Sequence, residues 1–237
     1  KMRIGVFDSG IGGISVLIRL VRELKNAEFV YYGDNKNAPY GNRSDRDIIK
    51  LSFSAANKLL SYKADAIVVA CNTASMVAGS TLGKILPVPV FGICPPAERE
   101  LSKSKTLLLC TEATAKRYRK YEGVNGFNVY PVKGLVEKIE GDPLSAEIID
   151  VKPFLKGITE RYETVILGCT HYYFVKIGIA NHLRPNKITD GENELVKAIK
   201  YYPKLVKNKK SSSKNKVLFI GNETDKNEHM FDKWFAE

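Results

Sequence analysis

The sequence predicts an α/β fold made of two similar open-sheet domains that face each other across a cleft. Short apolar runs typical of buried parallel strands alternate along the chain with segments of helical apolar spacing. A strand, a polar loop and a helix, followed later by a strand that ends in a cysteine, occur twice at a similar interval. A chain of 237 residues is long enough for two such domains with a sizeable core.

The first domain is expected to span residues 1–95 together with 207–237. Its predicted strands cover residues 3–7, 29–32, 66–70, 88–92 and 217–220. Its predicted helices cover residues 14–24, 44–60, 74–86 and a C-terminal stretch that ends at 235. The double proline at 95–96 favours a domain boundary there, because proline interrupts both helices and central strands.

The second domain is expected to span residues 96–206. Its predicted strands cover residues 105–110, 127–132 and 165–168. Its predicted helices cover residues 115–121, 136–139 and 143–161, with a last one that ends near 183, just ahead of Pro185. Both domains then have the strand–loop–helix order of open flavodoxin-like or Rossmann-like sheets.

The net charge of +11 and the pI near 9.4 permit nucleic-acid binding without establishing it. Much of the excess is local, in a lysine-rich segment between residues 204 and 216. That segment has no interleaved aromatics and no recognised nucleic-acid motif, so we expect a solvated connection and no nucleic-acid partner. No apolar run approaches the ~20 residues needed to span a bilayer, so no membrane partner is expected and the expected location is the cytoplasm.

Four cysteines are too few for a disulfide framework, and a reducing compartment would keep them as thiols. The chain has no CxxC pair and only three scattered histidines, so no metal site is expected. Cys94 and Cys110 are interpreted as small apolar residues.

Two of the cysteines stand at the ends of predicted strands. Cys71 follows the apolar run 66–70, and Cys169 follows the run 165–168. The carboxyl ends of strands in open α/β sheets are where ligands bind. A helix is expected to start near each cysteine, and a helix N-terminus lowers the pKa of a thiol. His171 could trade a proton with Cys169, and Asp8 could do so with Cys71 if the first and third strands are neighbours.

Residues 8–13, with the sequence Asp-Ser-Gly-Ile-Gly-Gly, form a glycine-rich loop after the first strand. The glycine spacing does not match GxGxxG, and an acidic residue at the strand end would repel a pyrophosphate, so a nucleotide site is not favoured. Two interpretations stay open from these residues alone. Asp8 and Ser9 either point into a cleft or simply cap the next helix.

Two acid–base groups that face each other from two domains suit the reversible inversion of a carbon centre, because one thiolate removes a proton while the opposite thiol supplies one. A redox disulfide is the alternative, and it requires Cα atoms within ~7 Å, which leaves no room for a substrate. A non-catalytic basic protein that binds nucleic acid through the lysine-rich segment is a third hypothesis.

Six segments, taken together and in order, resemble the glutamate racemase family. They are residues 7–13, 32–34, 39–41, 70–75, 111–114 and 168–172. The resemblance implies a cytoplasmic enzyme that needs no cofactor and interconverts L- and D-glutamate for peptidoglycan synthesis. It also implies two α/β domains with the active site between them. It leaves a homodimer open, because the dimer arrangement varies across the family.

Carried over residue by residue, the resemblance implies that Cys71 acts on D-glutamate and Cys169 on L-glutamate. Asp8 and His171 would assist these thiols, and Glu137, in a Leu-Val-Glu segment, would contribute to catalysis. The residues implied to line the substrate site are Asp8, Ser9, Tyr40, Gly41, Asn72, Thr73, Thr114 and Thr170.

Three positions depart from the pattern of the family. Tyr173 replaces a usual proline, Lys133 lies where a Cys-Pro stretch is expected, and Cys94 lies where an acidic residue is common. These departures bear on substrate selectivity, and a racemase of the same superfamily that acts on aspartate or another amino acid is the alternative.

Overall fold

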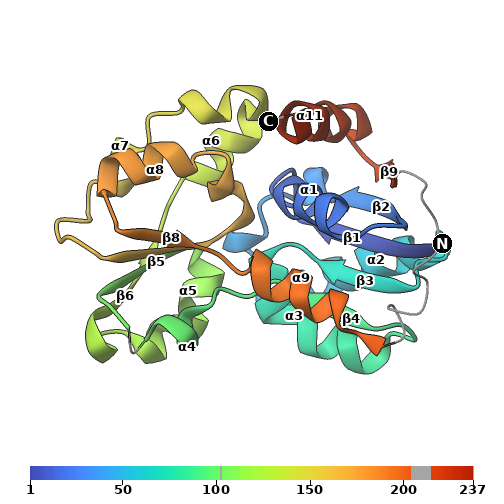
Figure 1. The fold of residues 1–237 in the computed structure, drawn as a ribbon, viewed down its shortest axis with the longest axis horizontal. Helices are drawn as coiled ribbons and strands as arrows, with labels where there is room; N and C mark the ends of the chain where they lie inside the picture. The colour runs from blue at the N-terminus through green and yellow to red at the C-terminus, as the bar shows by residue number, and fades with distance from the viewer. Residues whose placement is uncertain (102, 204–214, 237) are drawn as a thin grey trace.

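The computed structural model describes residues 1–101, 103–203 and 215–236, and within these ranges the strands form two parallel sheets that lie side by side (Figure 1). The first sheet has the order β4 (Val90–Gly92), β3 (Ala66–Val69), β1 (Met2–Asp8), β2 (Ala27–Gly33) and β9 (Lys216–Gly221). The second has the order β6 (Phe127–Pro131), β5 (Thr106–Cys110), β7 (Thr164–Gly168) and β8 (Lys187–Thr189).

The two sheets repeat one topology. In each, the first strand in sequence is flanked by the second and third, and the fourth lies outside the third. All paired strands run parallel. This order is that of flavodoxin-like sheets, so the prediction of two similar open-sheet α/β domains is confirmed.

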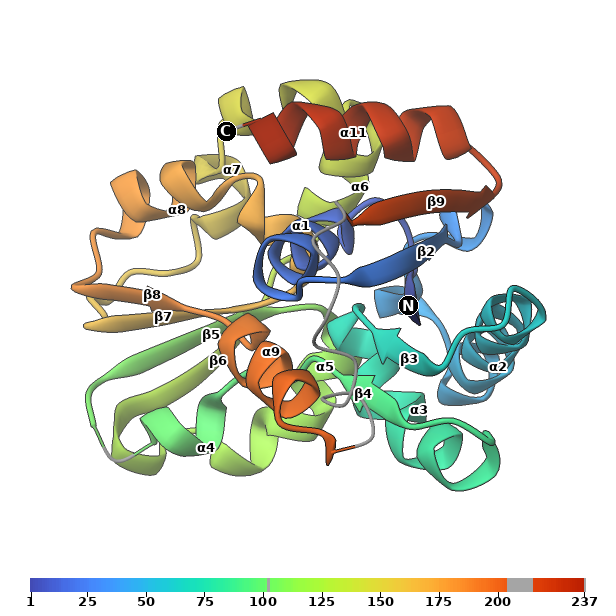
Figure 2. The same cartoon turned by 45° about the vertical axis from the view of Figure 1, so that its right-hand side comes forward.

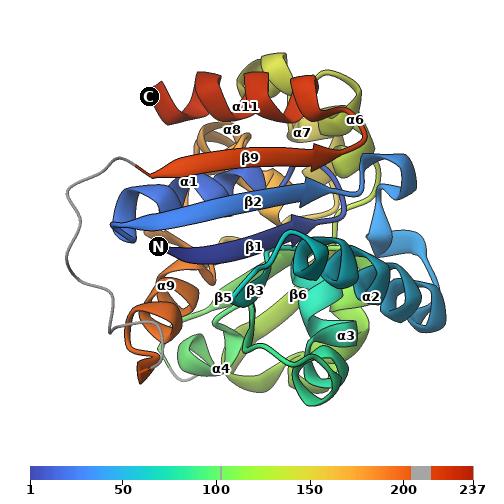
Figure 3. The ribbon, with the colours of Figure 1, turned by 90° about the vertical axis from the view of Figure 1, so that its right-hand side faces the viewer.

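The C-terminal strand β9 returns to the first sheet and pairs with β2 at its edge (Figure 3). The predicted domain boundary at 206/207 lies outside the described residues, as does most of the lysine-rich segment. The boundary at 95/96 stays a prediction. Helix α9 (Glu192–Lys200) follows β8 and packs against α1 (Ile14–Glu23) and β4 of the first sheet (Figure 2).

The helices around the first sheet form where apolar spacing predicts them. They are α1, α2 (Asp45–Ser61), α3 (Asn72–Ile85) and α11 (Thr224–Ala236). Ser44 begins α2, because its hydroxyl accepts a hydrogen bond from the backbone N–H of Asp47 at 3.2 Å. Helix α1 buries Ile14, Leu17 and Leu20, whose spacing places them on one face.

The helices around the second sheet differ more from expectation. They are α4 (Ala97–Glu100), α5 (Glu112–Tyr118), α6 (Leu135–Gly141), α7 (Lys152–Leu155) and α8 (Lys176–Leu183). Helix α5 starts before the predicted residue 115, because the Thr111 hydroxyl caps it. The helix predicted over 143–161 is wrong: residues 143–148 form a 3-10 helix and α7 is short. Each has a proline within its first two residues, and proline suits only a first turn.

The molecule has two halves, the first built around the first sheet and the second around the second sheet. Helix α11 joins them (Figure 1). It packs on β9, and it also contacts residues 143–148 of the second half. Lys233 pairs with Glu147 at 2.6 Å, and the Trp234 ring lies 5.1 Å from the Phe174 ring between centroids. None of the helices in the described ranges combines the length and apolarity that a bilayer crossing needs.

Candidate active site

The strand ends of the two sheets meet in one small cavity. Asp8 ends β1, Cys71 follows β3, Thr111 follows β5 and Cys169 follows β7. The cavity is lined from both halves, by Ser9, Pro39, Tyr40, Gly41, Cys71, Asn72, Thr73, Thr111, Val136, Cys169, Thr170 and His171. The two cysteines predicted from strand ends therefore lie on the wall of the same cavity.

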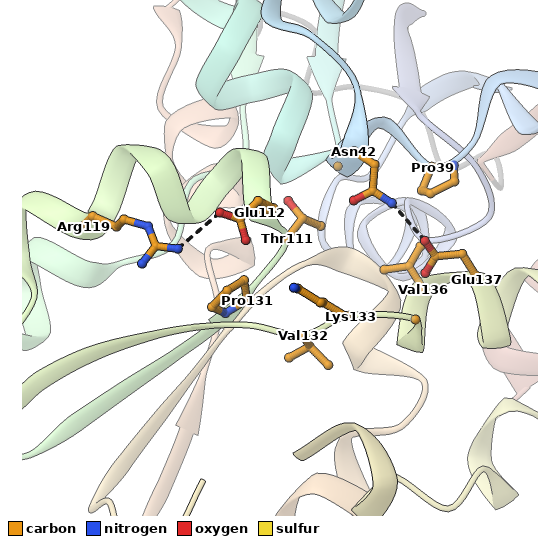
Figure 4. Close-up of a pocket in the computed structure, with 12 residues that line it drawn as sticks. Pro39, Asn42, Thr111, Glu112, Arg119, Pro131, Val132, Lys133, Val136 and Glu137 are labelled. Atoms are coloured by element: carbon orange, nitrogen blue, oxygen red, sulfur yellow. Dashed lines mark hydrogen bonds and ion pairs between the residues drawn. The ribbon is translucent and has the colours of Figure 1, made fainter. Parts of the chain in front are cut away.

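The cavity is closed around very little space. Its volume is about 10 Å³, which is room for about one water molecule. An outer pocket of about 630 Å³ lies beside it and shares Pro39, Gly41, Thr111 and Val136 with its wall (Figure 4). An amino acid is several times larger than a water molecule, so the cavity must widen before such a substrate can fit.

Cys71 is buried at the start of α3. Its Sγ lies 3.6 Å from the Ser9 Oγ and accepts a bond from the Ala74 N–H at 3.5 Å. Burial raises the pKa of this thiol to about 12, and the Asp8 carboxylate adds to the rise. The expectation of a lowered pKa is therefore wrong for Cys71, because the helix N-terminus does not outweigh desolvation in the closed site.

Asp8 is fully buried beside Cys71, on the strand that neighbours β3. Its Oδ1 accepts the Gly10 N–H at 2.9 Å, and its Oδ2 accepts the Thr170 hydroxyl at 3.2 Å. Burial raises the pKa of the carboxyl, although the nearby His171 opposes the rise. Asp8 thus contacts the loop that carries the other cysteine.

The second cysteine has a different set of partners. Cys169 Sγ lies 3.6 Å from Nδ1 of His171, and Nε2 of His171 lies 2.6 Å from Oε1 of Glu140. Burial alone would lower the pKa of His171, but its bonds to Cys169 and Glu140 outweigh this and hold the pKa well above its usual range. A 3-10 helix over residues 170–173 follows Cys169, so the expected α-helix N-terminus is not at this thiol; α8 starts only at Lys176.

Glu140, which was not predicted as a site residue, contacts His171, whereas the contribution of Glu137 to catalysis stays a prediction. Glu137 lines the outer pocket, where its Oε1 accepts a bond from Asn42 at 3.1 Å (Figure 4). The two carboxylates are three residues apart on α6 and therefore share a helix face. That spacing is the signal that could have identified Glu140.

Hydroxyl groups from both halves meet beside Cys71. Thr73 Oγ1 lies 2.8 Å from Thr111 Oγ1 and 3.4 Å from Thr114 Oγ1. Among the described residues, the buried Asn72 Oδ1 has no hydrogen-bond partner, so it can accept an N–H from a ligand. Thr111 was not predicted as a site residue, although its place at the end of β5 matches that of Asp8 in the first sheet.

Tyr40 and Gly41 line the inner cavity, and Gly41 also lines the outer pocket. The Tyr40 hydroxyl donates to Asp34 Oδ2 at 2.6 Å, so its polar group is already engaged. A Cβ on Gly41 would lie 2.7 Å from the Thr111 Cβ, which explains why glycine stands where the two halves approach.

Packing between the two halves explains the glycines of the loop over residues 8–13, without a bound nucleotide. A Cβ on Gly10 would collide with the Glu140 carboxylate, and a Cβ on Gly12 would collide with Thr170 and His171. The loop therefore lacks side chains where the second half packs against it. Among the described residues, no group of three or more His, Cys, Asp or Glu is arranged to hold a metal ion.

Comparison with known proteins agrees with this arrangement. The model of the Asp/Glu/Hydantoin racemase family matches residues 4–199. The chain is 37% identical to the glutamate racemase of Clostridium novyi, over 97% of this chain and 94% of that protein. It is 38% identical to the glutamate racemase of Aquifex aeolicus, over 90% and 86% of the two chains.

Solved structures show the same fold. Glutamate racemase from Francisella tularensis, in complex with D-glutamate, superposes with a TM-score of 0.77 at 29% identity, over 98% of this chain and 94% of that one. Glutamate racemase from Thermus thermophilus, in complex with beta-chloro-D-alanine, gives 0.79 at 30% identity, over 99% and 93%. The chain therefore belongs to the Asp/Glu/Hydantoin racemase family, which makes it an isomerase.

Proposed function

We propose that this chain is a glutamate racemase that works without a cofactor, through two thiols. The observation that carries the proposal is that Cys71 and Cys169 come from different sheets and line one cavity, each with its own acid–base neighbour. The similarity to glutamate racemases over nearly the whole chain supports glutamate as the substrate.

In the proposed mechanism, the Cys169 thiolate removes the α-proton of L-glutamate. The Cys71 thiol, which burial keeps protonated, supplies a proton to the opposite face and so yields D-glutamate. The return reaction uses the same groups in opposite roles. One proton leaves carbon and another reaches it, so no oxidant or electron carrier is consumed.

Asp8 and His171 are proposed to manage the charge on the two thiols. Protonated His171, next to Cys169, stabilises negative charge on that sulfur. The Asp8 carboxylate disfavours a thiolate at Cys71 and accepts the proton when Cys71 must act as the base. The two thiols thus have neighbours of opposite charge, a cationic imidazole at Cys169 and a carboxylate at Cys71, which suits a two-base inversion.

The remaining lining residues are proposed to hold the substrate. Asn72 Oδ1 is free to accept from the α-ammonium group, and the cluster of hydroxyls can donate to a carboxylate. The residues proposed for binding are Ser9, Tyr40, Gly41, Asn72, Thr73, Thr114 and Thr170, as expected from the sequence, together with Thr111. The proposed role in the cell is to supply D-glutamate for peptidoglycan synthesis in the cytoplasm.

The test is chiral chromatography of single amino acids incubated with the purified protein and no added cofactor. L-Glutamate should yield D-glutamate until the two are equal, and L-aspartate and L-alanine should react far more slowly. Conversion of aspartate with glutamate unchanged would reject glutamate as the substrate and favour another activity in the same superfamily.

A further inference from the structure

One carboxylate oxygen joins the second half of the molecule to the glycine-rich loop of the first. Glu140 Oε1 accepts the Ile11 backbone N–H at 2.9 Å and lies 2.6 Å from Nε2 of His171. Ile11 precedes α1 in the first half, whereas Glu140 lies on α6 in the second. The Glu140 backbone carbonyl also accepts the Lys226 ammonium of α11 at 3.0 Å.

The surroundings of Glu140 favour its charged form. Burial alone would raise the pKa of the carboxyl, but the hydrogen bond from His171 and the Ile11 N–H outweigh this and lower the pKa. The side chain of Glu140 is 14% exposed and that of His171 is 2% exposed, so little water screens the pair. The other ionisable groups that act on the pair are Asp8, Cys169 and Lys226.

We propose that Glu140 is a positioning residue for His171, and that it completes the Cys169 side of the site only when the two halves are closed together. The order Cys169, His171, Glu140 places a carboxylate behind an imidazole that serves a thiol. A carboxylate in that position fixes which ring nitrogen carries the proton and stabilises the charged ring. This inference rests on the proposed racemase function.

Glu140 is linked to closure because the Ile11 N–H that it accepts belongs to the other half of the molecule. The cavity must open to admit glutamate, and opening would take the glycine loop away from α6. Glu140 would then lose the Ile11 bond while keeping His171, which lies in its own half. The pair reaches its full set of bonds only around an enclosed substrate, so the acid–base group of Cys169 is coupled to closure.

Two substitutions separate the charge of Glu140 from its position. In Glu140→Gln, an amide oxygen can still accept from Ile11 and His171, but the negative charge is lost. In Glu140→Leu, the charge and both bonds are lost. Glu147→Gln is the matched control, because Glu147 is an exposed carboxylate in the same half that pairs with Lys233. An exposed pair of this kind contributes little to stability.

The expected result is that Glu140→Gln lowers kcat by about 10- to 100-fold, by analogy with the carboxylates that orient metal-binding imidazoles. KM should change much less, since Glu140 does not line the inner cavity. Glu140→Leu should lose more, and Glu147→Gln should match the unmodified protein. Circular dichroism of each variant reports whether the fold survives.

The deuterium isotope effect, measured separately for the L-to-D and the D-to-L reaction, distinguishes positioning from a general weakening of the fold. The equilibrium constant of a racemisation is fixed, so kcat/KM falls equally in both directions. In Glu140→Gln, proton removal by Cys169 should become slower, and the deuterium isotope effect should grow with L-[2-²H]glutamate and not with D-[2-²H]glutamate. Equal isotope effects in both directions, or full kcat in Glu140→Gln, would overturn the inference while leaving the racemase activity of the unmodified protein intact. Absence of racemisation in the unmodified protein would instead reject the proposed function.

Discussion

The Thr170 hydroxyl donates to Oδ2 of Asp8 at 3.2 Å, across the boundary between the two halves of the molecule. Thr170 follows Cys169 directly, and Asp8 influences the charge of Cys71. The loops that carry the two proposed acid–base systems are therefore in contact. A substitution in one loop should therefore change the rate of the proton-transfer step assigned to the other loop.

Asp8→Asn should lower activity and raise stability at neutral pH. The pKa of Asp8 is raised by burial, so its ionised form destabilises the fold above that pKa, and the penalty is absent below the unfolded value of 3.8. Asparagine keeps an oxygen for the Gly10 N–H and carries no charge. We expect kcat to fall by about 10²- to 10⁴-fold, the usual contribution of an acid–base group.

Thermal unfolding of the Asp8→Asn variant checks the predicted gain in stability. The gain in Tm should be present at pH 7–8 and should vanish as the pH falls below about 4. An unchanged kcat, or a lower Tm at neutral pH, would contradict the account of Asp8.

Gly12→Ala should impair closure of the site. A Cβ at residue 12 would collide with Thr170 and with the His171 ring, which are both buried. We expect kcat to fall by about 10-fold or more, because displacement of a proton-transfer group by a fraction of an ångström is costly. Steady-state kinetics with glutamate measures this.

Gly79→Ala is the control for the glycine substitution. Apart from its chain neighbours and the backbone of its own helix, no atom lies within 4 Å of a Cβ built at residue 79, which is in the middle of α3. This variant should keep full activity and gain about 0.5–1 kcal/mol of stability. Equal activity in Gly12→Ala and Gly79→Ala would show that the loop tolerates side chains.

The pair of His171 and Glu140 should make stability depend on pH. The pKa of His171 is raised, so its contribution is complete below 6.5 and is lost as the pH rises through the raised value. The pKa of Glu140 is lowered, so its contribution is complete above 4.5 and is lost as the pH falls through the lowered value. The pair therefore stabilises the fold most between pH 4.5 and 6.5.

Glu140→Gln should lose about 1.5–3 kcal/mol in that window, the usual value of a hydrogen bond to a charged group. The difference in Tm from the unmodified protein should shrink in strongly alkaline solution. A difference that does not vary with pH would mean that the two groups are not an ion pair.

Lys133 should help to draw a substrate with two carboxylates into the outer pocket. It lines that pocket near Thr111, and it forms no ion pair within the described residues, whereas Arg119 is paired with Glu112 (Figure 4). Lys133→Met should raise KM for glutamate by about two- to fivefold and leave kcat unchanged, as for one partly screened charge. Lys116→Met, an exposed lysine on α5, removes the same charge elsewhere and should change neither constant.

Much of the site could be predicted because it is encoded locally. An apolar run that ends in Cys71 or Cys169 marks a buried strand and its carboxyl end, and this pattern needs no long-range information. The meeting of the two strand ends depends on how one sheet packs against another, which no local pattern contains. Thr111 was missed for the same reason, since it becomes a site residue only beside Thr73.

The choice between two carboxylates on one helix also exceeds what the sequence shows. Glu137 and Glu140 share a face of α6, yet in the folded chain Glu140 contacts His171 and Ile11, while Glu137 contacts Asn42. Strand β8 was missed because its three residues, Lys187 to Thr189, form no apolar run. The helix after Cys169 was predicted too early, because residues 170–173 turn as a 3-10 helix before α8 begins.

The most direct test of the central claim is proton NMR of L-glutamate in D₂O with the unmodified protein and with Cys71→Ser, Cys169→Ser and Cys94→Ser. Cys94 is exposed, so its variant is the matched control. We predict that the α-proton signal disappears, with D-glutamate formed, for the unmodified protein and for Cys94→Ser. Neither Cys71→Ser nor Cys169→Ser should form D-glutamate at more than about a hundredth of that rate. Retention of the α-proton with the unmodified protein, or full racemisation by either of the two site variants, would contradict the two-thiol mechanism.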